Sequence, residues 1–328
     1  MNFRDYRNKI LSLQKNDPAF EQLALELYRF QSRENPVYSR YLQLIGRQDF
    51  SPTRQEEIPF LPIGFFKSAD VFCEGFKAEL RFSSSGTGGN RSRHLISDPE
   101  FYAHSSRVAF QQASGDIRNC EILALLPGYE ENPESSLIFM VKALQELSAS
   151  EVRFFGMDFA AFETALQDCW KRGHQPLIFG VSHAYLSLLE SGRKSDFSDA
   201  IMIETGGMKG LRKEISKTEL LETLEQGFLP KQLISEFGMC ELLSQAYGFP
   251  ERYHPAGTLR AFIRQPEDPL AAVSKSGRGV LNFIDLANYA SCAFIASEDL
   301  GSVYDDGSFS ILGRMDQAEI RGCNLLFA

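Results

Sequence analysis

The sequence lacks several features that would assign it to a class at once. No apolar run approaches the roughly 20 residues that a membrane-spanning helix needs. The N-terminal stretch Met1–Tyr6 shows no apolar core of the kind found in signal peptides. The six cysteines are scattered, none forms a Cys-x-x-Cys pair, and no zinc pattern is present. These absences predict a soluble cytoplasmic protein with reduced thiols.

Positive charge is also in short supply. Lysine and arginine number 34 against 43 acidic residues, which gives a formal net charge of −9. A nucleic-acid-binding surface normally carries a basic excess, so no nucleic-acid partner is expected. The chain has 328 residues, of which 43% are hydrophobic and 23% charged. That composition is typical of a globular protein with one large or two medium domains.

The N-terminal part of the chain predicts helices. Asp17-Pro18 and Asn35-Pro36 each supply a capping side chain followed by a first-turn proline. A proline-punctuated segment at 58–62 follows, where neither regular element is expected to persist. We therefore assign residues 1–75 to an N-terminal helical segment.

From residue 120 onward, strand-like and helix-like patterns alternate. Strands are expected at Cys120–Leu126, Val152–Phe155, Leu177–Val181 and Ala200–Glu204, with helices at 134–147, 158–172 and 182–191. A capping box, Ser216-x-x-Glu219, begins a further helix. Alternation of this length predicts an α/β fold, with a mainly parallel, doubly wound sheet and helices on its faces. We assign this core to residues 76–255.

The last part of the chain changes character. Short strands separated by turns are expected at Leu259–Arg264, Gly279–Asp285, Val303–Tyr304 and Ser308–Leu312. The pattern predicts a smaller β-rich subdomain over residues 256–328.

A Ser/Gly loop, residues 83–89, is the most informative motif. It reads Ser-Ser-Ser-Gly-Thr-Gly-Gly, follows a strand-like stretch and precedes the basic cluster Arg91, Arg93 and His94. Such a backbone can turn its N–H groups toward one point and hold phosphate without a side-chain charge. A flexible linker has the same composition. The loop is not a Walker A motif, because no Gly-Lys-Ser/Thr closes it, and its glycines do not fit the dinucleotide fingerprint.

Three further features are expected at the carboxyl ends of strands, where ligands bind in such sheets, or at the junction with the subdomain. Glu204–Gly210 contains paired glycines directly after a strand. They either let a flat ring lie against bare backbone or form an ordinary glycine-rich turn. Glu236–Glu241 places an aromatic residue and a carboxylate around a glycine; the alternative is a core phenylalanine and a solvated helix-start glutamate. Ser297–Gly301 and Gly313–Asp316 carry acidic residues that also suit two β-turns.

Taken in order, these four features resemble the core motifs of the adenylate-forming enzymes, which include acyl-CoA ligases, nonribosomal-peptide adenylation domains and luciferases. The resemblance runs from about residue 76 to the end of the chain and implies ATP and Mg²⁺ as cofactors. The ATP-binding residues that it implies are Ser83, Ser84, Ser85, Gly86, Thr87, Gly88, Gly89, Gly206, Gly207, Phe237, Gly238, Asp299 and Arg314. It also implies that Glu241 is a catalytic residue and Mg²⁺ ligand, with Cys240 where threonine is usual, and that Asp316 fits the hinge position.

A closer similarity is to the LuxE-type acyl-protein synthetases, through Pro59–Ser68 and Gly313–Cys323. The small C-terminal domain that carries a catalytic lysine in most adenylate-forming ligases is not expected, because the chain ends at Ala328. The resemblance implies activation of a carboxylic acid, most simply a fatty acid, to an acyl-adenylate with release of pyrophosphate. Acyl transfer to a thiol would follow, and Cys323 is the candidate nucleophile.

Two alternatives remain open at this stage. One is an acyl-CoA ligase with a reduced C-terminus, and the other is a nucleotide-binding protein without ligase activity. The acid substrate is the expected small-molecule partner, and an acyl-donor or acceptor protein or a second copy of the chain is a candidate protein partner.

Overall fold

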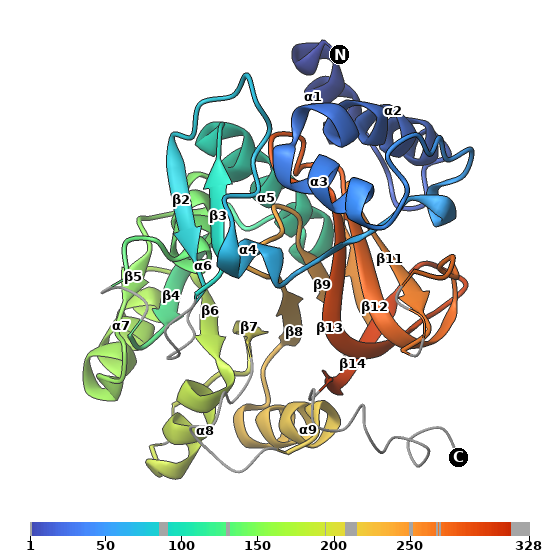
Figure 1. The fold of residues 1–328 in the computed structure, drawn as a ribbon. Coiled ribbons are helices and arrows are strands. Elements are labelled where there is room, and N and C mark those ends of the chain that lie inside the picture. The colour runs from blue at the N-terminus through green and yellow to red at the C-terminus, as the bar shows by residue number, and fades with distance from the viewer. Residues whose placement is uncertain are drawn as a thin grey trace. The chain divides into compact units, whose positions relative to one another are not determined.

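The structure, a computed structural model, describes residues 2–84, 91–128, 132–193, 195–206, 215–248, 252–266, 268 and 270–315. The chain forms two compact units (Figure 1). Unit 1 combines Met1–Phe76 with Gly257–Ala328, and unit 2 is Lys77–Ala256.

Unit 1 begins with the helices that the sequence predicts, preceded by one that it does not. The three helices are α1 (Phe3–Leu11), α2 (Ala19–Glu34) and α3 (Pro36–Leu44). The Asn35 side chain caps α3 by accepting from the Tyr38 N–H at 3.0 Å, and Pro36 occupies the first turn. The predicted N-terminal helical segment is therefore confirmed.

The proline-punctuated segment contains more regular structure than expected. Short elements follow α3: η1 (Gln55–Glu57), β1 (Leu61–Pro62) and α4 (Phe65–Ser68). β1 pairs in parallel with β13 (Phe294–Val303), with Leu61 opposite Ile295. Leu61 is fully buried in this pairing, whereas Pro62, which has no N–H to donate, is exposed.

The C-terminal part of unit 1 is an antiparallel sheet in the order β11-β12-β13-β14, which confirms the predicted β-rich subdomain. Its other strands are β11 (Leu259–Arg264), β12 (Gly277–Asp285) and β14 (Phe309–Arg314). β13 is much longer than the predicted Val303–Tyr304, because pairing on both sides overrides the turn-like residues within it. Gly301 permits one close approach, since a Cβ there would lie 2.2 Å from the Ser310 carbonyl oxygen.

Hydrogen bonds attach the N-terminal helices to this sheet. Gln31 on α2 donates to the Asn288 carbonyl at 2.7 Å and accepts from the Ala293 N–H at 2.9 Å. Asn35 donates to the Ser291 carbonyl at 2.9 Å. Both side chains are fully buried, so they satisfy backbone groups of the β12–β13 connection that water cannot reach.

Unit 2 holds a mainly parallel sheet, which confirms the predicted fold class. Its strand order is β10-β9-β8-β7-β6-β4-β5, parallel from β8 to β5 and antiparallel at β9 and β10. The strands are β4 (Cys120–Leu125), β5 (Arg153–Phe154), β6 (Gln175–Val181), β7 (Ile201–Thr205), β8 (Gln232–Phe237), β9 (Ala246–Gly248) and β10 (Tyr253–Pro255). A separate hairpin pairs β2 (Leu80–Ser83) with β3 (Arg93–Ile96).

Helices and short 3-10 turns connect these strands. They are α5 (Pro99–Ser114), α6 (Ser136–Ala143), η2 (Leu144–Leu147), α7 (Phe159–Lys171), α8 (Ser182–Glu190) and α9 (Lys217–Phe228). Ser216 caps α9 by accepting from the Glu219 N–H at 3.1 Å, as predicted. Across the described parts of both units, no helix combines the length and apolar character needed to cross a bilayer.

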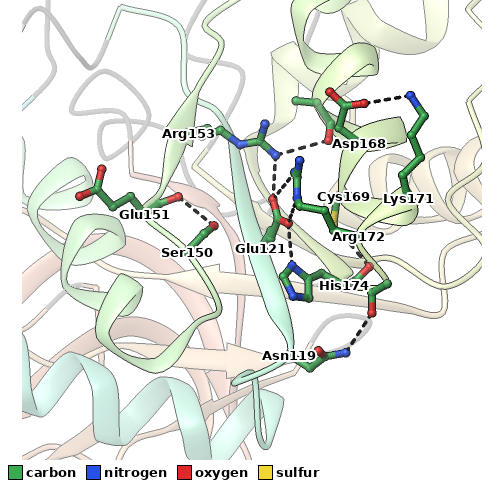
Figure 2. Close-up of polar contacts among 12 residues, drawn as sticks. Asn119, Glu121, Ser150, Glu151, Arg153, Asp168, Cys169, Lys171, Arg172 and His174 are labelled. Carbon is green, nitrogen blue, oxygen red and sulfur yellow. Dashed lines mark hydrogen bonds and ion pairs between the residues drawn. The ribbon is translucent and has the colours of Figure 1, made fainter.

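One carboxylate lies near the amino end of the otherwise apolar strand β4 (Figure 2). Glu121 accepts from Arg172 Nε at 2.7 Å and Nη2 at 2.8 Å, and from Arg153 Nη2 at 2.9 Å. His174 Nδ1 lies 2.7 Å from the same carboxylate. The hydrogen bonds from Arg172 are the main reason that the Glu121 pKa falls to about 2. This cluster ties β4, β5, the end of α7 and the start of β6 together at the edge opposite the carboxyl ends of the strands.

Candidate functional site

The base of the Ser/Gly loop is closed by its own strand ends. The Ser84 N–H donates to the Ser92 carbonyl at 3.0 Å, and the Ser92 N–H donates to Ser84 Oγ at 3.1 Å. The Ser83 hydroxyl donates to the carboxylate of Glu134, which Arg81 also binds. The side chains of Ser83 and Ser84 therefore shape the base of the loop.

His94 connects this hairpin to the turn that follows β8. Its ring is fully buried in β3, and Nδ1 lies 2.8 Å from the carbonyl oxygen of Cys240. Burial lowers the His94 pKa to about 4, only partly offset by that hydrogen bond, so the ring is neutral at pH 7. The sequence pattern predicted a basic cluster of Arg91, Arg93 and His94; the burial and neutrality of His94 correct that interpretation.

The motif from Phe237 to Glu241 leaves the carboxyl end of β8. Phe237 is the last residue of the strand, and its ring centroid lies 5.7 Å from that of Tyr253. A Cβ at Gly238 would lie 2.7 Å from Glu236 Oε1, so a side chain there would require the Glu236 carboxyl to move. Glu241 is 6% exposed and lies in a turn. The alternative of a solvated helix-start glutamate is therefore wrong.

A buried charge pair lies at the end of the neighbouring strand, β7. Glu204 is fully buried and forms an ion pair with Lys217, the first residue of α9. Ser235 Oγ donates to Glu204 Oε2 at 3.1 Å, and the Ser182 hydroxyl bonds Glu204 and reaches the Gly206 carbonyl at 3.1 Å. Burial disfavours the Lys217 ammonium, but the charge of Glu204 outweighs it and raises the lysine pKa.

These contacts fix the turn at Gly206, whose φ of +76° requires a left-handed backbone. The sequence motifs include Glu204 but indicated no role for it, and they indicated none for Lys217 or Ser182. The available signal was a carboxylate ending an otherwise apolar strand, where a buried charge needs a partner.

A second buried carboxyl lies on the next strand. Glu236 pairs with Thr205 in the β7–β8 ladder and accepts a hydrogen bond from its hydroxyl. Burial raises the Glu236 pKa to about 7, although Thr205 and Lys217 act in the opposite direction. Because successive residues of a strand point to opposite faces, Glu204 and Thr205 direct their side chains to different sides of the sheet.

Unit 1 carries the other two described site residues. Asp299 on β13 pairs with Arg314 on β14, and Arg314 Nε donates to Asp299 Oδ1 at 3.1 Å. The Asp299 side chain is 10% exposed, while that of Arg314 is 69% exposed. Burial raises the Asp299 pKa, and the Arg314 charge partly offsets the shift. Neither residue lies in a β-turn, so the turn interpretation of these two segments is wrong.

The remaining predicted site residues lie outside the described part of the chain. They are Ser85, Gly86, Thr87, Gly88, Gly89, Gly207, Asp316 and Cys323.

Unit 2 thus brings the base of the Ser/Gly loop to the turn containing Glu241, and it sets Gly206 and Phe237 at the ends of adjacent parallel strands. The described side chains include no group of three or more metal-ligating residues. Glu241 alone still suits Mg²⁺, which commonly takes one or two carboxylates and completes its shell with water and substrate phosphates.

Comparison with known proteins gives a match in fold only. No protein-family model and no curated protein matches the sequence. A crystal structure of 2-hydroxyisobutyryl-CoA ligase, in the postadenylation state with R3-HIB-AMP, is similar with a TM-score of 0.69 and 12% identity over 92% of this chain and 68% of that chain. The same ligase with 2-HIB-AMP and CoA, in the thioesterification state, is similar with a TM-score of 0.68 and 12% identity. That match covers 97% of this chain and 70% of that chain.

O-Succinylbenzoate coenzyme A synthetase (MenE) from Bacillus subtilis, in complex with AMP, is similar with a TM-score of 0.52 and 16% identity. The match covers 73% of this chain and 50% of that chain, so this chain spans about half the length of MenE. At such identities the likeness establishes the fold, which matches the large N-terminal domain of adenylate-forming enzymes.

Proposed function

We propose that this protein activates a carboxylic acid with ATP, forming an acyl-adenylate and releasing pyrophosphate. The observation that carries the proposal is the contact between His94 and Cys240, through which the base of a phosphate-type loop adjoins the turn with the buried Glu241. The fold supports it, because the similar structures contain AMP or an acyl-adenylate according to their descriptions.

The chemistry accounts for these residue types. A carboxylate is a poor acyl donor because its leaving group would be an oxide ion, and joining it to AMP corrects that. Positioning and charge neutralisation at the phosphates are then the main tasks of the protein. Backbone N–H groups of the loop beyond Ser84, whose own N–H is bonded to the Ser92 carbonyl, would hold the departing phosphates, and Glu241 would hold Mg²⁺. When bound, Mg²⁺ supplies positive charge at the phosphates.

Nucleotide recognition is assigned to the residues that the sequence motifs indicate. We propose that Asp299 accepts the ribose hydroxyls and that Arg314, already bonded to Asp299 Oδ1, fixes the direction of that carboxylate. The Asp299 oxygen that Arg314 does not bond is the proposed ribose acceptor. The backbone at Gly206 and Gly207, with Phe237, would face the adenine ring.

The proposed acceptor of the acyl group is a thiol. The resemblance to LuxE-type acyl-protein synthetases favours Cys323, with transfer of the acyl group from AMP to sulfur and loss of the thiol proton. Coenzyme A is the second candidate, because one similar structure is described as a ligase with 2-HIB-AMP and CoA. The proposed substrate is a fatty acid, and the proposed location of the enzyme is the cytoplasm, in soluble form.

The direct test is ATP–pyrophosphate exchange across a panel of short, long and aromatic acids. We expect exchange that depends on both Mg²⁺ and one class of acid. Exchange accompanied by CoA-dependent AMP release identifies an acyl-CoA ligase. MgATP binding without exchange for any acid identifies a nucleotide-binding protein and overturns the ligase proposal.

Intact-protein mass spectrometry tests the acceptor. After incubation with MgATP and an accepted acid, we expect a hydroxylamine-sensitive adduct that is lost in Cys323→Ser, while this variant still exchanges pyrophosphate. Cys240→Ser is the matched control, because Cys240 is partly exposed whereas the other four described cysteines are buried. An adduct that persists in Cys323→Ser excludes Cys323 as the acceptor.

A further inference from the structure

One buried histidine joins the two segments to which phosphate and metal binding are assigned. His94 Nδ1 lies 2.8 Å from the Cys240 carbonyl oxygen. A carbonyl oxygen only accepts, so Nδ1 carries the hydrogen in this contact. Cys240 directly precedes Glu241, and the orientation of their shared peptide therefore sets the direction from which the Glu241 side chain starts.

The same turn contacts the hairpin at a second point. Cys240 Sγ lies 4.0 Å from the Ser92 carbonyl oxygen, a distance at which a thiol makes a weak hydrogen bond. That carbonyl also accepts from the Ser84 N–H at 3.0 Å. The residue that closes the base of the Ser/Gly loop is thus the one that the Cys240 side chain touches.

The chemistry of His94 is more specific than packing requires. A fully buried imidazole loses its hydration, and an apolar side chain would fill the space without that cost. What the ring adds is one directed donor, fixed in a strand and aimed at one carbonyl. Its neutral state at physiological pH means that the contact brings no charge to the phosphate site.

We propose that His94 is a positioning residue of the nucleotide site. It holds the turn of Glu241 against Ser92, at the base of the Ser/Gly loop, and so fixes the position from which the Glu241 carboxylate acts on the bound nucleotide. This inference rests on the proposed function, because it takes both segments to bind MgATP.

Two amide substitutions separate the position of the donor from its polarity. In His94→Asn the amide nitrogen takes nearly the place of Nδ1, whereas in His94→Gln it lies near that of Nε2. Both amides are neutral and buried, so their costs of burial are similar. We expect Asn to keep wild-type constants, and Gln to raise both the MgATP dissociation constant and the Mg²⁺ requirement for exchange about tenfold. The KM for the acid should change little in either variant.

Phe82→Leu is the control for loss of stability. Phe82 is the cross-strand partner of His94 in the same hairpin, is equally buried, and packs on Tyr102 with ring centroids 5.4 Å apart. It should lower the thermal midpoint without changing the Mg²⁺ requirement. Nucleotide binding is measured by calorimetry with MgATP and exchange is measured separately, so the binding result does not depend on turnover.

The outcomes are distinct. The inference is supported if His94→Asn is near wild type while His94→Gln has a raised MgATP dissociation constant and a raised Mg²⁺ requirement for exchange. Equal constants for Asn, Gln and wild type, or changes that Phe82→Leu reproduces, overturn it while leaving the proposed function intact. A wild-type protein that binds no MgATP removes the proposed function and this inference with it. If Gln fails to fold, an Asn variant whose MgATP dissociation constant and Mg²⁺ requirement rise about tenfold overturns the inference, because Asn keeps the donor near the position of Nδ1.

Discussion

Arg314 Nε donates to Asp299 Oδ1 at 3.1 Å between residues that are directly paired on β13 and β14. The buried partner is the acid and the exposed partner is the base. The guanidinium thus engages one oxygen of a largely buried carboxylate and fixes the direction of the other.

The first prediction concerns this pair. Asp299→Ala should raise the KM for ATP about tenfold to a hundredfold, the range expected when a charged hydrogen-bond acceptor is lost. It should also remove the preference for ATP over 2′,3′-dideoxy-ATP, because the variant has no acceptor for either hydroxyl. Exchange kinetics with both nucleotides measure the effect. An unchanged KM, or an unchanged preference, would contradict the ribose assignment.

The second prediction concerns Glu241. Glu241→Gln should cut the exchange rate by at least ~100-fold, about 2.7 kcal/mol of transition-state stabilisation. The side chain keeps its shape, so calorimetric unfolding should change little. Glu163→Gln is the control. Glu163 lies on α7, accepts hydrogen bonds from Arg193 and Ser195, and belongs to no proposed site. Near-normal exchange in Glu241→Gln would leave this carboxylate a structural role only.

Sequence patterns predicted the elements that local chemistry dictates. The cap at Asn35, the cap at Ser216 and the apolar strands β4 and β6 occur where their residues indicate them. The patterns missed α5, whose buried face includes Ser105 and Ser106 and therefore lacks a clear apolar stripe.

They also missed strand β8, because Ser235 and Glu236 interrupt its apolar residues. These two side chains are buried by partners distant in sequence, Glu204 and Thr205, which no local window contains. The motif positions of Glu241 and Asp299 can be predicted because they depend on the local sequence alone. The burial of Glu241 and the neutrality of His94 cannot. Both properties depend on segments that only the tertiary fold brings together.

The third prediction concerns the Glu121 cluster (Figure 2). The folded-state pKa of about 2 lies below the usual 4.5, so this carboxylate stabilises the fold above pH 4.5 and the contribution disappears as pH falls toward 2. Glu121→Gln should cost ~2 kcal/mol at pH 7, because Arg172 and Arg153 lose a buried charged acceptor. Asp168→Asn, which affects an exposed pair with Lys171, should cost well under ~1 kcal/mol.

Urea unfolding between pH 7 and pH 3 measures this difference. The two curves for wild type and Glu121→Gln should converge on the acid side. Parallel curves over the whole range would show that the carboxylate carries no pH-dependent stability.

The last prediction concerns Glu236 and has the opposite sign. Burial raises the pKa of this carboxyl from 4.5 to about 7, so the folded state holds the proton more tightly than the unfolded chain. Its contribution to stability is fully present below pH 4.5 and is lost as pH rises through 7. Glu236→Gln stays neutral at every pH and can still accept from Thr205, so its advantage over wild type should grow between pH 5 and pH 8.

Thermal midpoints at several pH values measure that advantage, and Lys217→Met extends the test. The Lys217 charge lowers the Glu236 pKa, so Lys217→Met should raise that pKa. The fall in thermal midpoint with pH should then extend to higher pH. The comparison must be made within the Lys217→Met background, since that variant also leaves Glu204 buried without its ion-pair partner. There, the advantage of Glu236→Gln should keep growing to a higher pH, and reach a larger value, than in the wild-type background. An advantage that is constant with pH would mean that Glu236 is ionised in the fold, with Thr205 and Lys217 together outweighing its burial.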